Sequence, residues 1–184
     1  MRGEREILVH ACCGPCSTAS IERLLEEGWI PTILYTNSNI FPHEEFEKRW
    51  DNLVIVCGHY HIPLLREEQD HQAWLSFIKG LEQEKEGGAR CRKCWEYNLQ
   101  RTYRKAQEWG FSHFCTTLTV SRFKKSPLIF QVGSAFGLFE PIDFKKKDGF
   151  AKSCRLSQEL GLYRQRYCGC EFSLHDSSVA PVYN

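Results

Sequence analysis

The stretch EILVHACCGPCSTASIERLLEEG, residues 6–28, decides the fold, because it sets a strand, a turn and a helix in direct succession. Its first part, 6–11, is a short apolar run typical of a strand buried in a sheet. Pro15 suits the first turn of the helix that follows, and Gly28 suits its C-terminal stop. Cysteines therefore fall where the strand ends and the helix begins, at Cys12, Cys13 and Cys16. Unpaired N–H groups at a helix N-terminus favour thiolates, which makes this turn a candidate site.

The same alternation of elements continues along the first two thirds of the chain. Strands are expected at 31–37, 62–67 and 113–121, and amphipathic helices at 43–59, 71–84 and about 91–109. Strands that alternate with helices of this length imply parallel β-α-β crossovers, and ligands of such sheets gather at the carboxyl ends of the strands. We therefore expect an α/β fold, a parallel sheet flanked by helices, with its site at the cysteine-containing turn.

The last third of the sequence is less regular. It predicts a helix at 126–140, a strand and turn at 141–149, a short helix at 150–162 and a compact, cysteine-containing segment at 163–173. With 184 residues, of which 42% are hydrophobic, the chain is long enough for one substantial core. We expect a single α/β metalloenzyme domain over residues 1–175 and a disordered tail over 176–184.

Composition argues for a cytoplasmic protein that keeps its cysteines reduced. The apolar runs are far too short for a membrane span, and the N-terminal residues lack the apolar stretch of a signal peptide. Ten cysteines are then more typical of ligands and redox groups than of a disulfide framework. Cys57 and Cys115 differ from the rest, because each lies in an apolar stretch and is expected to be a small buried hydrophobe.

A formal net charge of +1 conceals an uneven distribution of charge. Residues 1–121 carry 14 basic and 17 acidic side chains, a net charge of −3, whereas residues 122–184 carry 10 and 6, a net charge of +4. A basic C-terminal part is compatible with a solvated surface and with nucleic-acid binding alike.

The second cysteine group, CRKCW, places Cys91 and Cys94 on one side of a helical turn. Two ligands do not complete a structural zinc site, and Cys12 and Cys13 can supply the other two if the loops meet. Side chains of adjacent cysteines diverge, however, which suits the separate corners of an iron–sulfur cluster better than one small ion. An iron–sulfur cluster, a zinc site and a redox dithiol all remain open at this point.

The third group, YCGC, sets Cys168 and Cys170 one residue apart. Such a pair can close a tight, strained disulfide that accepts electrons readily, and it can equally be two further metal ligands or a free pair in a surface turn. The preceding YRQRY offers phenols and guanidinium groups, which suit phosphate contacts and base stacking.

The cysteine groups and their surroundings together resemble one known family. The segments HACCGPCS, CRKCWEYNLQRTYRKAQEWG, SPLIFQVG and DFKKKDGFAKSCRLSQELGLYRQRYCGC follow one another in this order. From His10 to about Ser173 the sequence resembles the epoxyqueuosine reductases of the QueH family. That family reduces epoxyqueuosine to queuosine at wobble position 34 of tRNAs with a GUN anticodon, those for aspartate, asparagine, histidine and tyrosine, without cobalamin.

The resemblance implies cofactors and their ligands. It implies a [4Fe–4S] cluster on Cys12, Cys13, Cys91 and Cys94, a redox-active disulfide between Cys168 and Cys170, and an external electron donor. A second metal close to the cluster, an iron, is also suspected, with Cys16, His10 and Asp143 as candidate ligands. The order of elements is similar to the Rossmann-like HUP layer of PP-loop tRNA enzymes, whose Ser-Gly-Gly loop binds ATP. Here ACCGPCST occupies that place, so we do not expect ATP to be used.

Removal of the epoxide oxygen needs two electrons, a group that holds the oxygen and protons that release it as water. An iron site is expected to bind the oxygen, and Tyr163, Tyr167 or Asp143 to carry protons. The residues expected to bind tRNA are Lys124, Lys125, Lys145, Lys146, Lys147, Arg164 and Arg166, with Arg164, Tyr163 or Tyr167 against the flipped wobble base. Two other functions remain open, a zinc-stabilised RNA-binding module without catalysis and an ATP-dependent tRNA-thiolation enzyme.

Overall fold

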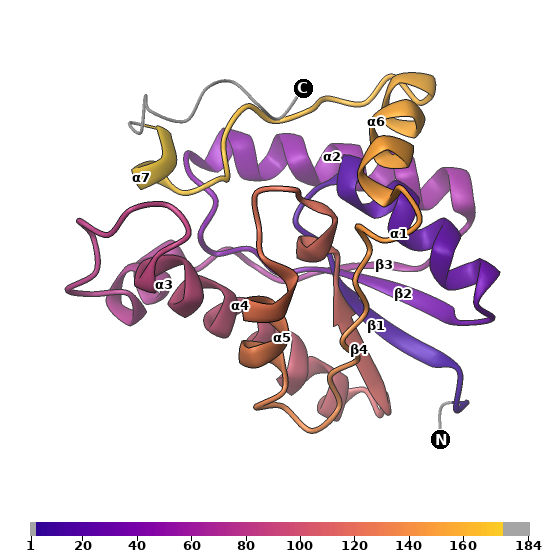
Figure 1. Cartoon of the computed structure of the whole chain (residues 1–184), viewed down its shortest axis with the longest axis horizontal. Coiled ribbons are helices and arrows are strands. Elements are labelled where there is room, and N and C mark those ends of the chain that lie inside the picture. Colours follow the sequence, from indigo (N-terminus) through magenta and orange to yellow (C-terminus); the bar gives the residue numbers. More distant parts are fainter. Residues whose placement is uncertain (1–2, 175–184) are drawn as a thin grey trace.

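A computed structural model of the chain describes residues 3–174 and shows a four-stranded parallel sheet with helices on both faces (Figure 1). The strands are β1 (Glu6–His10), β2 (Ile30–Tyr35), β3 (Leu64–Arg66) and β4 (His113–Thr116), in the order β3-β2-β1-β4. All three pairs of neighbours run parallel, and Val9 of β1 lies between Ile33 of β2 and Cys115 of β4. The predicted α/β fold is confirmed, whereas the predicted tail at 176–184 lies outside the described residues.

Helices cover the two faces of the sheet unequally. One face carries α1 (Gly14–Glu26), α2 (His43–Tyr60) and α6 (Gly149–Glu159), and the other carries α4 (Ala89–Glu108), with α3 (His71–Phe77) and α5 (Ser126–Gly133) packed on α4 (Figure 1). β1 is apolar at successive positions because both its faces are covered: Ile7 and Val9 pack toward α1 and α2, and Leu8 packs toward α4. Each fully buried side chain of this size contributes about 1.5–3 kcal/mol relative to its exposed state.

Several predicted elements end earlier in the structure than in the sequence pattern. The helix expected at 71–84 ends at Phe77, and the chain turns at Gly80 with a φ of +87°. The helix expected at 126–140 ends at Gly133, and the ring of Phe139 then folds back into the space where a Cβ on Gly133 would lie. At 141–144 no strand forms, and an isolated bridge joins Phe114 to Phe139 within the described residues.

The strand expected at 113–121 is also shorter than predicted. It ends at Thr116, whose side chain accepts a hydrogen bond from the backbone N–H of Leu118 at 3.2 Å and so starts the 3₁₀ helix η1 (Thr117–Val120). This turn places Thr117 beside the first cysteine turn, where its Oγ1 lies 3.8 Å from Cys12 Sγ.

Cys57 and Cys115 are buried in the apolar core, as predicted for small hydrophobic residues. Within residues 3–174 no helix has the length and apolarity that a crossing of the bilayer requires. After α6 the chain returns across α2 as an extended segment and ends its described part in α7 (Glu171–Leu174) (Figure 1). Residues 163–170 of this segment are here called the strap, which contacts Cys13 after β1 through Gln165 and Phe41 after β2 through Gly169.

Candidate functional site

The turn between β1 and α1 brings three sulfur atoms together. The Sγ atoms of Cys12, Cys13 and Cys16 all lie within 4.8 Å of one another, and those of Cys12 and Cys13 are 3.8 Å apart. The turn is tight because Gly14 packs against α2, where a Cβ would lie 2.8 Å from the carbonyl oxygen of Asn52. A sulfur-only group of this size is a candidate metal site.

Hydrogen bonding within this group makes Cys13 the most acidic of its thiols. The S–H groups of Cys12 and Cys16 hydrogen-bond Cys13 and lower its pKa, while the same interaction with Cys13 raises the pKa of Cys12 to about 12. The side-chain amide of Gln165, from the strap, also donates to Cys13 Sγ at 3.2 Å. The guanidinium of Arg49 contributes further by its positive charge.

The second cysteine group, at the start of α4, faces the first. Cys12 and Cys16 line one cavity together with Cys94 and with Cys168 from the strap. Cys91 lies in a buried cluster with Trp95 and Leu118, and Cys12 packs against this cluster. The β1–α1 turn and the start of α4, almost eighty positions apart in the sequence, therefore present thiols to the same cavity.

Cys91 and Cys94 are held by the local structure of α4. The backbone N–H of Gly87 donates to Cys91 Sγ at 3.1 Å, and the amide of Asn98 lies 3.9 Å from Cys94 Sγ. Burial raises the pKa of Cys91 to about 11 and also raises the pKa of Cys94. The guanidinium of Arg90 donates to the carbonyl of Glu82 at 2.8 Å, which fixes the loop before the helix.

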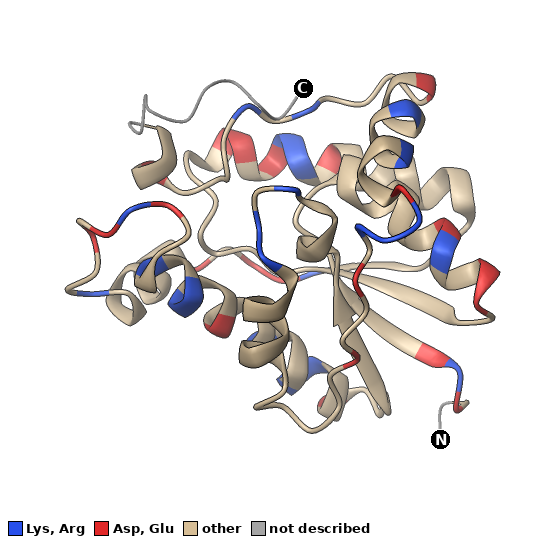
Figure 2. Ribbon diagram, viewed as in Figure 1, with Lys and Arg blue, Asp and Glu red and all other residues tan. Residues whose placement is uncertain are grey.

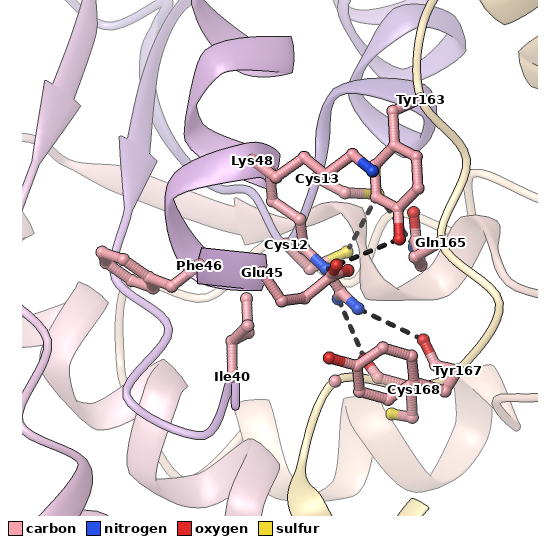
Figure 3. Close-up of polar contacts among 12 residues, drawn as sticks. Cys12, Cys13, Ile40, Glu45, Phe46, Lys48, Tyr163, Gln165, Tyr167 and Cys168 are labelled. Carbon is pink, nitrogen blue, oxygen red and sulfur yellow. Dashed lines mark hydrogen bonds and ion pairs between the residues drawn. The ribbon is translucent and has the colours of Figure 1, made fainter. Parts of the chain in front are cut away.

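A buried arginine, Arg49, fastens the strap to α2, and nearby Tyr163 of the strap points to Glu45 of α2 (Figure 3). Arg49 donates from Nη1 to the carbonyl of Cys168 at 3.0 Å and from Nη2 to the carbonyl of Tyr167 at 3.2 Å. Its Nε lies 2.7 Å from Glu45 Oε1, and the Arg49 side chain is 1% exposed. Burial is the largest single influence and opposes the charge of Arg49, but Glu45, Cys13 and Tyr35 together outweigh it, so the pKa of Arg49 is raised.

Further contacts fix the strap on either side of Arg49. The hydroxyl of Tyr163 donates to Glu45 Oε2 at 3.0 Å, and the backbone N–H of Tyr163 donates to Asn52 Oδ1 at 2.8 Å. At its other end the carbonyl of Gly169 accepts from the N–H of Phe41 at 2.7 Å. The strap is therefore a positioned part of the cavity wall.

Gly169 allows the turn between the last two cysteines. Its φ of +137° disfavours any other residue, and a Cβ there would lie 3.0 Å from Arg49 Nη1. In this structure Cys168 and Cys170 are both free thiols: Cys168 is half-buried at the cavity, and Cys170 is buried with its sulfur 3.7 Å from Ser173 Oγ. The disulfide between them stays a prediction.

The structure brings other predicted site residues into polar contacts. His10 is fully buried, with Nδ1 2.8 Å from Thr116 Oγ1 and Nε2 3.2 Å from Asn37 Oδ1. Burial lowers its pKa to about 4. Both ring nitrogens are thus engaged between β4 and the loop after β2.

Asp143 and Tyr167 lie in turns rather than among the residues that line the cavity. Asp143 Oδ1 accepts from Ser126 Oγ at 2.8 Å and from the backbone N–H of Lys145 at 3.2 Å. The hydroxyl of Tyr167 donates to the carbonyl of Phe41.

The predicted RNA-binding residues lie on the loop before α5, on the turn before α6 and on the strap, where Figure 2 shows basic positions in blue. Lys124 and Arg164 line the cavity, on the loop before α5 and on the strap respectively. Lys145 donates to the carbonyl of Ser121 at 3.3 Å, and Lys147 Nζ lies 3.4 Å from Glu27 Oε1. The remaining members are exposed: Lys125, Lys146 and Arg166.

Sequence reasoning missed Glu45, Arg49 and Gln165. The spacing of Glu45 and Arg49, four positions apart in a helix, predicts an ion pair but on an exposed face. Nothing in the sequence marks the pair as buried or predicts that it holds a segment more than a hundred positions away.

Comparisons with known proteins identify the family of the chain. The profile of a family described as Epoxyqueuosine reductase QueH matches residues 7–176. The chain is 36% identical to the epoxyqueuosine reductase QueH of Streptococcus pyogenes serotype M1, over 91% of this chain and 69% of that protein. It is 33% identical to that of Thermotoga maritima, over 91% and 90%, and 31% identical to that of Haemophilus influenzae, over 96% and 74%. The prediction of an oxidoreductase is thereby confirmed, and the chain belongs to the epoxyqueuosine reductase QueH family.

Proposed function

We propose that this protein reduces epoxyqueuosine to queuosine at wobble position 34 of tRNAs with a GUN anticodon. The observation that carries the proposal is the cavity, which gathers Cys12, Cys16, Cys94 and Cys168 from three separate parts of the chain. Lys124 and Arg164 line the same cavity and give it the positive charge that a nucleotide substrate requires. Membership of the family and this arrangement of thiols support the same reaction.

The donor set fits an iron–sulfur cluster. Every candidate ligand at the cavity from the β1–α1 turn and from α4 is a thiol, the ligand type that holds such clusters. In the proposal Cys12, Cys13, Cys91 and Cys94 hold a [4Fe–4S] cluster. Cys16 is the sulfur of the turn that remains for a second metal, because both ring nitrogens of His10 are engaged. When bound, the cluster supplies single electrons and an iron that acts as a Lewis acid toward the epoxide oxygen.

The strap cysteines supply the two electrons of the overall reaction. When Cys168 and Cys170 form a disulfide they release two electrons and two protons. The two C–O bonds of the epoxide break, the alkene forms, and the oxygen leaves as water. An external electron donor then returns the disulfide to two thiols. Arg49 holds Cys168 at the cavity throughout, because it binds the carbonyls of Tyr167 and Cys168.

Tyr163 is the best placed of the three proposed proton carriers, which also include Tyr167 and Asp143. Its hydroxyl is hydrogen-bonded to Glu45 Oε2, and Glu45 is paired with Arg49, which lines the cavity. Burial raises the pKa of Tyr163, so the phenol keeps its proton until a base accepts it. Asp143 holds the turn before α6 through Ser126, and its proposed role is secondary to that of Tyr163.

Replacing Cys168 by serine tests the proposal. We expect the C168S variant to lose multiple turnover on an epoxyqueuosine-containing tRNA with a chemical reductant, and to keep the visible absorption of its cluster. The control is Cys154→Ser, a partly buried thiol in α6 that does not line the cavity. Undiminished steady turnover by C168S would remove the electron-relay role of the strap.

A zinc-stabilised RNA-binding module is the second candidate, and one observation favours it. Three sulfurs within 4.8 Å of one another are close enough for a single ion. Elemental analysis of anaerobically purified protein separates the candidates, because a cluster protein is brown with iron and sulfide, and a zinc protein is colourless. An ATP-dependent tRNA-thiolation enzyme is the third candidate, and ATP-independent loss of the epoxide would exclude it.

A further inference from the structure

A groove beside the cavity is lined by residues that the proposed reaction does not use. Phe123 and Lys125 come from the loop before α5, and Arg92 and Trp95 come from the first turns of α4. Trp95 also lines the cavity, so the cavity and the groove share a wall. A ligand bound in the cavity would therefore lie next to a ligand bound in the groove.

The loop before α5 forms the rest of this shared wall. Ser121 and Lys124 line the cavity, whereas Phe123 and Lys125 line the groove. Phe123 is 38% exposed, a large exposed fraction for an aromatic side chain that is flanked by basic residues. The loop thus presents positive charge to both hollows and an aromatic ring to the groove.

Aromatic rings and guanidinium groups alternate from the groove to the cavity. The Arg122 guanidinium lies 5.1 Å from the ring centroid of Phe123 and 5.0 Å from that of Phe150. Arg164 follows, 5.9 Å from the Phe150 ring, and both Phe150 and Arg164 line the cavity. Aromatic and guanidinium planes of this kind are the surfaces on which proteins stack single-stranded bases.

We propose that the groove binds the nucleotide next to the wobble nucleotide in the anticodon loop, with its base on Phe123 and its phosphate near Lys125 and Arg92. This inference rests on the proposed function, in which the wobble base occupies the cavity. A base that leaves the stack to reach a cavity also deprives its neighbour of a stacking partner, and Phe123 replaces that partner.

The charges of the groove favour RNA over a protein partner. Its basic members, Arg92 and Lys125, are exposed, and the acidic residue that lines it, Glu86, is half-buried. The phosphate between two adjacent nucleotides lies where the cavity and the groove meet, which is where Lys124 and Lys125 point to opposite sides of one loop.

A double-mutant cycle between protein and RNA tests this inference. The probes are anticodon stem-loop RNAs that are intact, abasic at position 33, or abasic at position 35, and binding to the anaerobic holoenzyme is measured by fluorescence anisotropy. The protein variants are Phe123→Ala and Phe123→Trp. Ile30→Ala is the control, because Ile30 is 60% exposed at the start of β2, at the end of the sheet away from the cavity.

We expect Phe123→Ala to weaken binding of the intact RNA about tenfold, the loss typical of one base–aromatic stack. Removal of the base at one of the two positions, 33 or 35, should weaken wild-type binding to the same extent as Phe123→Ala does. The Phe123→Ala variant should lose little more affinity when it binds that abasic RNA. Phe123→Trp should bind at least as tightly as the wild type, and Ile30→Ala should not differ from it.

The inference would be overturned if the loss of affinity from Phe123→Ala and the loss from the abasic RNA multiply when the two are combined. It would also be overturned if Phe123→Ala binds the intact RNA with wild-type affinity. If an RNA abasic at 34 then still loses affinity, the proposed function stands without the groove. If Phe123→Ala keeps RNA affinity and turnover with dithionite but loses turnover with a protein reductant, the groove binds the electron donor and the inference is wrong. If the wild type fails to reduce an epoxyqueuosine stem-loop, the proposed function fails, and the binding cycle still decides the role of Phe123.

Discussion

Replacement of Arg49 by methionine is expected to destabilise the metal-free protein by about 4 kcal/mol. Methionine keeps an aliphatic stem but removes the charge, so Glu45 is left buried without its ion-pair partner. The Glu45 side chain is 9% exposed and the Arg49 side chain 1% exposed. Breaking a buried ion pair from one side costs about 3–5 kcal/mol. The carbonyls of Tyr167 and Cys168 also lose a charged donor, and such hydrogen bonds contribute about 1.5–3 kcal/mol each when they are not replaced by water.

The carbonyl losses are not added in full, because both groups lie in the partly exposed strap, where water can replace the guanidinium. A loss of about 4 kcal/mol is a large share of the roughly 5–15 kcal/mol that stabilises a domain. It corresponds to a fall in Tm of about 8–16 °C for a chain of this length.

Urea unfolding of the reduced, metal-free protein, followed by far-ultraviolet circular dichroism, measures the effect. Arg166→Met is the control, because Arg166 is exposed on the same strap and its loss should change the free energy of unfolding by no more than about 0.5 kcal/mol. The double variant R49M/E45Q should recover part of the loss, since it leaves no unpaired charge. A loss below about 1 kcal/mol for R49M, or penalties for R49M and E45Q that simply add, would refute the reasoning.

Two further predictions concern packing and charge. Gly14→Ala should lower the free energy of unfolding by about 1–3 kcal/mol, because the new Cβ would lie 2.8 Å from the Asn52 carbonyl oxygen. Gly58→Ala should raise the free energy of unfolding by about 0.5–1 kcal/mol, because Gly58 has open space around it in α2. Equal effects of the two substitutions in thermal unfolding would contradict this. Lys124→Ala should reduce the salt dependence of tRNA binding by about one unit of slope, because Lys124 lines the cavity. Lys147→Ala should reduce it by less, because Lys147 lies in the turn before α6 and does not line the cavity; affinities titrated against salt should rank the two variants in this order.

The sequence was sufficient to predict a parallel sheet and the first cysteine-containing turn. The apolar run of β1, Pro15 and Gly28 are local signals, and they predict local structure because a strand buried on both faces and a helix terminus each have their own residue pattern. From that turn the position of the cavity at the carboxyl ends of the strands follows from the topology of a parallel sheet.

Contacts between distant segments could not be predicted. Arg49 lies in an amphipathic helix, where a charged residue normally faces water, and only the return of the strap explains its burial. In the same way the packing of the Phe139 ring on Gly133, at the end of α5, is a contact that the sequence pattern at 126–140 does not mark. Lys145 and Lys147 belong to a basic run in the sequence, but the fold gives each a local partner.

The hydrogen bond from Gln165 to Cys13 joins residues that are 152 positions apart. A ribosome that adds about 5–20 residues per second needs roughly 8–30 s to make the intervening chain. Throughout that interval the thiols of the nascent β1–α1 turn exist without the segment that will cover them. The Cys13 thiol therefore gains its last hydrogen-bond donor only after nearly the whole chain has been synthesised, which makes completion of this turn a late event in folding.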